Sequence, residues 1–291
     1  MSRIQQILDK AEREGAVRRT TTAAPHGPAA APLMPPVDGQ RTSHAEPHWT
    51  PVPPVEPVVR AARQVTSGRL SPLLVAALAP HALAAEQYRT LRTRLAAADH
   101  GHARRVLLVT SPSKGDGKSV TAANLALTMA QDFNHNVVLV EADMRRPTLA
   151  TLCGVGRDRG LVDVLMGGAA LEDVLVQLPE QNLFVLPAGP MTNRATELLG
   201  SSMMSRLVDT LRSRFSRIVV DSPPVTLADT HVLARMADGI LIVVRAGVTS
   251  RPALEHALEG VERERIAGLV LNDVDLSVGA YPGAYAWAAG A

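Results

Sequence analysis

The stretch Thr110-Ser-Pro-Ser-Lys-Gly-Asp-Gly-Lys-Ser119 decides the fold, because it joins an apolar run to an amphipathic segment. The run Arg105–Val109 predicts a buried strand, and the segment Ser119–Gln131 predicts a helix. The two glycines before the lysine let backbone N–H groups close around phosphate oxygens, and the start of the helix adds its positive end. The sequence therefore predicts a phosphate-binding loop, although Pro112 stands where the strict pattern has its first glycine.

Each part of this loop has an expected role in binding ATP. Lys118 is expected to reach the β- and γ-phosphates, and the Ser119 hydroxyl to ligate Mg²⁺. The remaining nucleotide-binding candidates of the loop are Ser113, Lys114, Gly115, Asp116, Gly117 and Val120.

Two further strands are expected to end in acidic residues. These ends read Val140-Glu-Ala-Asp-Met-Arg145 and Val219-Val-Asp-Ser-Pro223. Ligands of open α/β sheets bind at the carboxyl ends of the strands, so Glu141, Asp143 and Asp221 should converge on the loop. One carboxylate can hold Mg²⁺, with Asp143 and Asp221 as the candidates, and another can accept a hydroxyl proton. Arg145 could either stabilise phosphate charge or pair with a carboxylate.

The rest of the chain between residues 71 and 275 alternates short apolar runs with helical segments. Such runs read as strands buried on both faces, and the helices between them imply a parallel sheet covered on both sides. We therefore expect an α/β fold, a P-loop NTPase three-layer sandwich with a mostly parallel sheet. The expected strands are Val137–Val140, Leu183–Leu186, Ile218–Val220, Ile240–Val244 and Leu269–Leu271, and the expected helices Thr196–Arg214, Ala228–Ala237 and Pro252–Arg263.

Composition divides the chain into four parts. Residues 1–14 predict a short amphipathic helix, which is either frayed or a docking peptide for a partner. Residues 15–70 are rich in proline and alanine and predict a disordered linker. Residues 71–275 form the expected P-loop domain, and residues 276–291 a flexible tail that holds two of the three tyrosines of the chain.

Composition and charge exclude several classes of protein. A single cysteine excludes an internal disulfide and a cysteine-based zinc site. The net charge of +2, without a local basic block, gives no argument for a nucleic-acid partner. We find neither a signal-peptide core nor about 18 consecutive apolar residues, so we expect a cytoplasmic protein that reaches the inner face of the membrane only through a partner.

Several motifs in order give the chain a family resemblance. The loop, the segment Glu141–Thr148 and the segment Val220–Pro224 resemble the Walker A, Walker A′ and Walker B motifs of the bacterial tyrosine kinases. These are the autokinases of capsule and exopolysaccharide synthesis, related to the ParA/MinD ATPases. The resemblance covers about Leu83 to Asp275, and the remaining matches are Pro187–Pro190, Thr196–Leu199, Val244–Gly247 and Val270–Asn272.

The resemblance implies an ATP-dependent protein-tyrosine autokinase. Glu141, where the family usually has Asp, or Asp143 would take the proton of an incoming tyrosine, and Asn272 would contact the adenine. Tyr281 and Tyr285 would be the phosphoacceptors, each tail entering the active site of a neighbouring subunit. By spacing alone, Glu86, Arg89 and Arg92 favour an exposed helix face with internal ion pairs. The resemblance favours the other reading, because these residues match the family segment that joins subunits into a ring.

The implied partners are a membrane polysaccharide co-polymerase that activates the kinase, further copies of the chain, and a protein-tyrosine phosphatase that reverses the modification. Two other functions use the same site. A ParA/MinD-like ATPase would have water as the nucleophile, and a regulatory adaptor would bind the nucleotide without turnover.

Overall fold

The computed structural model describes residues 63–64, 70–99, 104–132 and 136–274. The predicted N-terminal helix, nearly all of the predicted linker, and the tail with Tyr281 and Tyr285 lie outside these residues. The predictions made for them therefore stay predictions.

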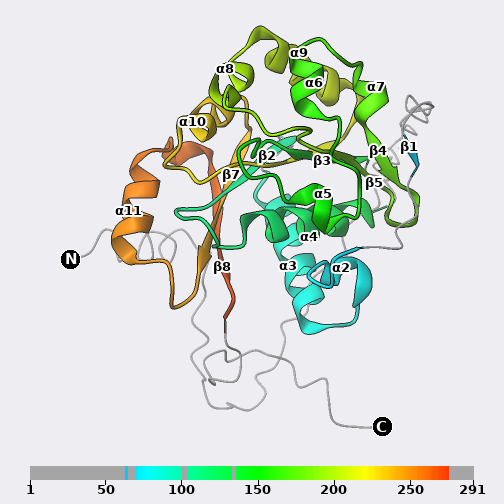
Figure 1. The fold of residues 1–291 in the computed structure, drawn as a ribbon. Helices are drawn as coiled ribbons and strands as arrows, with labels where there is room; N and C mark the ends of the chain where they lie inside the picture. Colours follow the sequence, from blue (N-terminus) through cyan, green and yellow to red (C-terminus); the bar gives the residue numbers. More distant parts are fainter. Residues whose placement is uncertain (1–62, 65–69, 100–103, 133–135, 275–291) are drawn as a thin grey trace, which may run out of the picture. The chain divides into compact units, whose positions relative to one another are not determined.

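An eight-stranded sheet forms the centre of the described chain (Figure 1). Its strand order is β1-β4-β5-β3-β6-β2-β7-β8, and every neighbouring pair is parallel except β4 and β5. The mostly parallel sheet confirms the predicted fold class. The strands are β1 (Arg63–Gln64), β2 (Val106–Thr110), β3 (Val137–Glu141), β4 (Val176–Leu178), β5 (Leu183–Leu186), β6 (Arg217–Asp221), β7 (Gly239–Arg245) and β8 (Ile266–Asn272).

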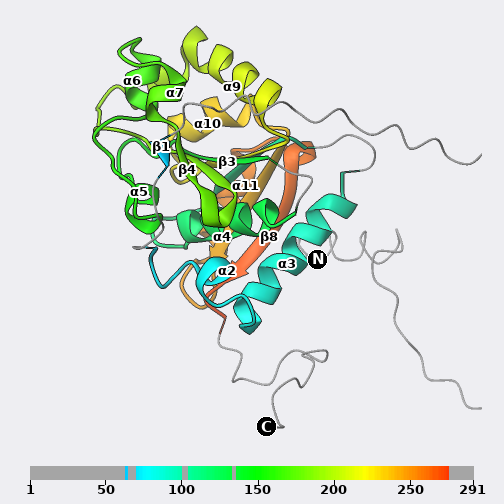
Figure 2. The same cartoon turned by 90° about the vertical axis from the view of Figure 1, so that its right-hand side faces the viewer.

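Helices cover both faces of this sheet (Figures 1 and 2). One apolar core lies between the sheet and the helices α2 (Val75–Leu78), α3 (Leu83–Ala97), α4 (Lys118–Ala130) and α5 (Leu149–Leu152). The other lies between the sheet and α6 (Leu161–Leu165), α7 (Leu171–Val174), α8 (Ala195–Leu199), α9 (Ser202–Arg214), α10 (Ala228–Ala234) and α11 (Arg251–Glu259). The three-layer prediction is therefore also confirmed.

The register of the central strands brings the predicted site together. Every residue of β2 and of β3 is buried, as expected for strands covered on both faces. Asp221, at the end of β6, is the register partner of Val109 in β2 and of Glu141 in β3. The phosphate loop and both acidic strand ends therefore leave the same edge of the sheet.

Three elements differ from the sequence predictions. The helix predicted over Thr196–Arg214 is wrong as one helix, because α8 ends at Leu199 and the Ser201 side chain caps α9 by accepting the N–H of Met204. The antiparallel strand β4 was not predicted, since a three-residue strand shows little alternation. Strand β1 lies inside the segment predicted as a linker and pairs with β4.

Within the described residues, no helix has the length and apolar character required to cross a bilayer.

Candidate functional site

The phosphate loop connects β2 to α4 as predicted. Gly115 and Gly117 have φ angles of 88° and 94°, in the left-handed region that favours glycine. Gly117 also caps α4, so the first backbone N–H groups of this helix face the loop. Ser113 and Lys114 are exposed at the loop tip, whereas Asp116 is buried.

Lys118 lies between the two predicted metal-binding carboxylates. Its Nζ is 3.0 Å from Asp143 Oδ2, 4.0 Å from Asp221 Oδ1 and 3.3 Å from Ser119 Oγ. Burial lowers the pKa of Lys118, but the carboxylates of Asp221 and Asp143 outweigh burial and raise this pKa above its usual value. The ammonium group is therefore charged at neutral pH and available to a phosphate oxygen.

Asp221 is fully buried at the end of β6. Among the residues that the structure describes, neither of its carboxylate oxygens has a hydrogen-bond partner. Burial raises the pKa of Asp221 to about 7, although the charge of Lys118 opposes the rise. A buried carboxylate without donors beside a phosphate loop is an oxygen ligand available to a cation.

The groups around the phosphate loop fit Mg²⁺ bound together with a nucleotide better than a metal ion bound by protein side chains alone. Among the described residues no group of three or more His, Cys, Asp or Glu side chains could hold a metal ion. Two carboxylates and the Ser119 hydroxyl remain at the loop, and Mg²⁺ typically uses one or two carboxylates, substrate phosphates and waters. Asp143, Asp221 and Ser119 could therefore hold Mg²⁺ together with the phosphates of a nucleotide.

Glu141 has different partners, although it leaves the same strand as Asp143. Its Oε1 accepts the backbone N–H groups of Thr148 and Leu149, and its Oε2 accepts that of Ala188 at 3.0 Å. Burial raises the pKa of Glu141, although the backbone N–H groups around the carboxylate oppose the rise. The carboxylate thus joins the end of β3 to the start of α5 and to the segment after β5.

Arg145 is paired with a carboxylate, which is one of its two predicted uses. Its Nε lies 2.6 Å from Asp229 Oδ2, and its Nη2 lies 3.2 Å from Asp229 Oδ1. The Thr196 hydroxyl also donates to Asp229. Burial raises the pKa of Asp229, but the bonds from Arg145 and Thr196 outweigh it and hold this pKa below its usual value. Sequence reasoning missed Asp229, because an acid in the first turn of α10 reads as a helix-end charge.

Asn272 reaches the phosphate loop from the end of β8. Its Nδ2 donates to the carbonyl oxygen of Asp116 at 3.0 Å and lies where a Cβ on Gly117 would be. The Asp116 carboxylate is held in turn by Thr249, a residue of the β7–α11 connection that was not predicted. No sequence signal distinguishes Thr249 from a polar residue at the start of α11.

The three predicted oligomerisation residues lie on α3 and have partners within the chain. Arg89 pairs with Glu86 at 2.7 Å and donates to the carbonyl of Pro80, and Arg92 donates to the carbonyl of Thr128 on α4. The Glu86 side chain is 60% exposed and that of Arg89 30% exposed. These contacts match the alternative of a helix face with internal ion pairs, and the oligomerisation role stays a prediction.

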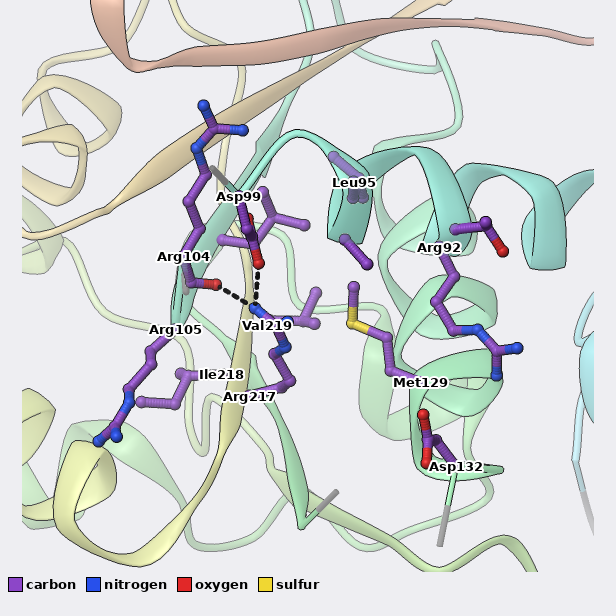
Figure 3. Close-up of a pocket in the computed structure, with 13 residues that line it drawn as sticks. Arg92, Leu95, Asp99, Arg104, Arg105, Met129, Asp132, Arg217, Ile218 and Val219 are labelled. Carbon is purple, nitrogen blue, oxygen red and sulfur yellow. Dashed lines mark hydrogen bonds and ion pairs between the residues drawn. The ribbon is translucent and has the colours of Figure 1, made fainter. Parts of the chain in front are cut away.

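A cavity of about 230 Å³ lies between α3 and the amino ends of β2 and β6, at the opposite edge from the phosphate loop. Figure 3 shows the Arg217 guanidinium beside Asp99, with which it forms an ion pair of 3.0 Å. The other arginines of the cavity, Arg92, Arg104 and Arg105, point in different directions rather than to a common point (Figure 3). The ion pair anchors the chain at the end of α3, and the cavity is separate from the phosphate-loop site.

Comparisons with known proteins show the family to which the chain is similar. Residues 105–266 match the family model described as an AAA domain. A tyrosine-protein kinase of Bacillus subtilis, YwqD, is 32% identical over 75% of this chain and 92% of its own length. A tyrosine-protein kinase of Streptococcus agalactiae, CpsD, is 31% identical over 67% of this chain and 85% of its own. The solved kinase domain of the Escherichia coli tyrosine kinase ETK is 27% identical with a TM-score of 0.68, over 75% of this chain and 86% of that domain.

Proposed function

This chain belongs to the bacterial tyrosine-protein kinase family, and from that premise we propose that it transfers the γ-phosphoryl group of ATP to tyrosines of its own C-terminal tail. The observation that carries the proposal is the position of Lys118 between Asp143 and Asp221 at the end of the phosphate loop. One cation and two carboxylate oxygens beside a phosphate loop support the binding of the terminal phosphates of a nucleotide there.

The transfer needs a group that takes the phenol proton. The tyrosine oxygen attacks the γ-phosphorus, the bond from that phosphorus to the bridging oxygen of ADP breaks, and the proton passes to a carboxylate. Asp143 fits this role better than Glu141, because Asp143 Oδ2 lies beside the Lys118 ammonium at the phosphate loop, whereas both Glu141 oxygens accept backbone N–H groups from other segments. Bound Mg²⁺ would supply charge neutralisation for the phosphates.

We assign the nucleotide-binding role to the loop as a whole. Its backbone amides and the start of α4 would surround the phosphates, with Lys118 on the terminal ones. Asn272 lies against Gly117, beside the loop, which is consistent with a position near the base of the nucleotide. Arg145 contributes indirectly in this scheme, since its partner is Asp229.

The acceptors would be Tyr281 and Tyr285, which follow β8 in the sequence. We propose that the tail of one subunit enters the site of another within a ring that α3 helps to form. Phosphorylation would add charge beside the subunit contacts and loosen the ring. Such a cycle, activated by a membrane polysaccharide co-polymerase and reversed by a phosphatase, would regulate the polymerisation and export of a capsule or exopolysaccharide.

Mass spectrometry tests the chemistry directly. No Lys or Arg follows Arg265, so trypsin should release Ile266–Ala291 as one peptide with both tail tyrosines. After incubation with Mg²⁺ and ATP we expect phosphate on this peptide in the unchanged chain. The control Arg206→Met, which changes an exposed arginine, should carry the same amount of phosphate. Lys118→Met should carry at least 100-fold less, since this variant lacks the cation for the terminal phosphates.

A mixing experiment separates transfer between subunits from transfer within one. An active chain that ends at Val274 has no tail, and the full-length Lys118→Met chain has a tail but no active site. Label on the Lys118→Met chain in the mixture is the expected result. The absence of phosphate from the tail peptide in every sample would contradict the kinase proposal. Phosphate release from ATP would then indicate the ATPase, and nucleotide binding alone the adaptor.

A further inference from the structure

Asp116 raises a physical problem for a loop that binds phosphates. Its carboxylate belongs to the loop itself, and a negative charge directed at the phosphates would oppose their binding. Asp116 is instead only 1% exposed, whereas Ser113 and Lys114 at the loop tip are open to solvent. A buried carboxylate requires hydrogen-bond donors inside the protein.

Neutral donors from two directions hold it. Asp116 Oδ2 accepts the backbone N–H of Ser113 at 2.8 Å, which closes the loop on itself. Asp116 Oδ1 accepts the Thr249 hydroxyl at 2.8 Å, from a segment 133 residues further along the chain. In the described part of the chain, Asp116 makes no ion pair, so these hydrogen bonds are what compensates its burial.

Thr249 is itself fixed by the end of β7. Its Oγ1 accepts the backbone N–H of Arg245 at 2.9 Å, and its own N–H donates to the Arg245 carbonyl at 3.0 Å. Because the hydroxyl accepts from Arg245, its single proton is directed at Asp116. The β7–α11 connection therefore presents one oriented donor to the phosphate loop.

Asn272 adds a second connection to the same residue. Its side-chain amide donates to the Asp116 carbonyl, and its own carbonyl accepts the N–H of Ala246 in the β7–α11 connection. Asp116 is thus bound at its side chain from the end of β7 and at its main chain from the end of β8. These two strands are neighbours in the sheet, so both contacts come from one rigid support.

The geometry points to Thr249 as a positioning residue for the nucleotide: its hydroxyl holds the Asp116 carboxylate away from the phosphates and keeps the loop amides directed at them. The inference deepens the proposed kinase function and rests on it for the identity of the nucleotide. Thr249 does not touch the phosphates in this scheme, and its effect passes through Asp116.

Three variants of the full-length chain test the assignment. Thr249→Val keeps the shape and removes the donor, and Thr249→Ser keeps the donor. Val248→Ala is the matched control, because Val248 lies in the same turn and is 63% exposed. The readouts are the Kd for a fluorescent ADP analogue with Mg²⁺, and the rate of amide hydrogen exchange of the loop peptide without nucleotide.

We expect Thr249→Val to weaken ADP binding about tenfold and to speed exchange at Ser113, since it leaves a buried charged acceptor without its donor. Thr249→Ser should restore both readouts to within about twofold, and Val248→Ala should behave as the unchanged chain. A lower melting temperature of Thr249→Val, with the Kd and the loop exchange both unchanged, would assign Thr249 a purely structural role and overturn the inference.

A double-mutant cycle identifies the residue through which Thr249 acts. In an Asp116→Ala background, Thr249→Val should have no further effect on the Kd, because the acceptor has already been removed. Full additivity of the two substitutions would overturn the inference. The exchange measurement needs neither nucleotide nor transfer, so it decides this inference even for a chain that never labels a tyrosine.

Discussion

Glu141 and Asp143 leave strand β3 two residues apart, and their carboxylates have different partners. Asp143 faces the Lys118 ammonium, whereas Glu141 accepts the backbone N–H groups of Thr148, Leu149 and Ala188. The extra methylene of glutamate, relative to the aspartate usual in the family, gives this carboxylate the reach to bridge three chain segments. Glu141 is therefore suited to hold the site together rather than to take part in the transfer.

The substitution Glu141→Gln separates these two roles. The glutamine NH₂ cannot accept the amide protons that one carboxylate oxygen now accepts, so we expect the free energy of unfolding to fall by about 1–3 kcal/mol. Urea denaturation measures this loss. The kcat per folded molecule should stay within a few-fold of the unchanged chain. A fall of several orders of magnitude in kcat, with unchanged stability, would restore Glu141 as the base.

The sequence predicted the chemical groups of the site better than their contacts. Lys118, Asp143 and Asp221 follow from a loop and two strand ends that share one edge of the sheet, and the structure brings these three together. Thr249 and Asp229 were missed, because each reaches the site from a helix start where a polar residue is ordinary. A contact between residues more than 80 positions apart leaves no local pattern to detect.

At the scale of elements, each predicted strand has a counterpart in the sheet, because burial on both faces of a strand produces a run of apolar residues. The prediction of burial on both faces is wrong for β8, since none of its residues is buried and Leu269 and Leu271 are more than half exposed. The very short strands β1 and β4 were missed, because they carry too few residues for such a run. The boundary between α8 and α9 was not predicted, for a related reason. The helical spacing of apolar residues continues through Gly200 without a break. The cap formed by Ser201, which starts α9, is recognised only once the backbone is known.

The ion pair of Asp238 with Arg212 connects elements and gives a pH-dependent prediction. Asp238 accepts two bonds from Arg212 of α9 and the N–H of Val106, the first residue of β2. Burial raises the pKa of Asp238, but these bonds outweigh it and lower the pKa below the usual value of about 3.9. The stabilisation is therefore present above about pH 4 and is lost as the pH falls through the folded-state pKa.

We expect Asp238→Asn to lower the free energy of unfolding by about 1–2 kcal/mol at pH 7, since it weakens the bonds to Arg212. Urea titrations at a series of pH values should show the difference between the two chains shrinking below about pH 4. Glu255→Gln is a suitable control, because the Glu255 carboxylate is about half exposed and pairs with Arg251 along α11. A difference that is independent of pH would contradict the assignment.

At the scale of the whole molecule, nucleotide should stabilise the described domain, because the site is assembled from β2, β3, β6 and the ends of β7 and β8. With Mg²⁺ and ADP at about 100 times the Kd, the gain is about 2.7 kcal/mol. For a domain of this size we expect a rise in melting temperature of about 5–10 °C. Removing Mg²⁺ with a chelator should abolish most of this rise, and the Lys118→Met chain should show little of it. An equal rise without Mg²⁺ would contradict the metal assignment.

The strand order also has a consequence for how the chain is made. Strand β2, which carries the phosphate loop, is flanked in the sheet by β6 and β7, whose residues come more than 100 positions later. A ribosome adding about 5–20 residues per second leaves this central strand without either neighbour for on the order of ten seconds. During that interval the apolar strand β2 has no neighbouring strand, so the nascent chain should depend on chaperones. A messenger RNA truncated before the codon for residue 239 should yield a protein that lacks β7 and that proteases degrade.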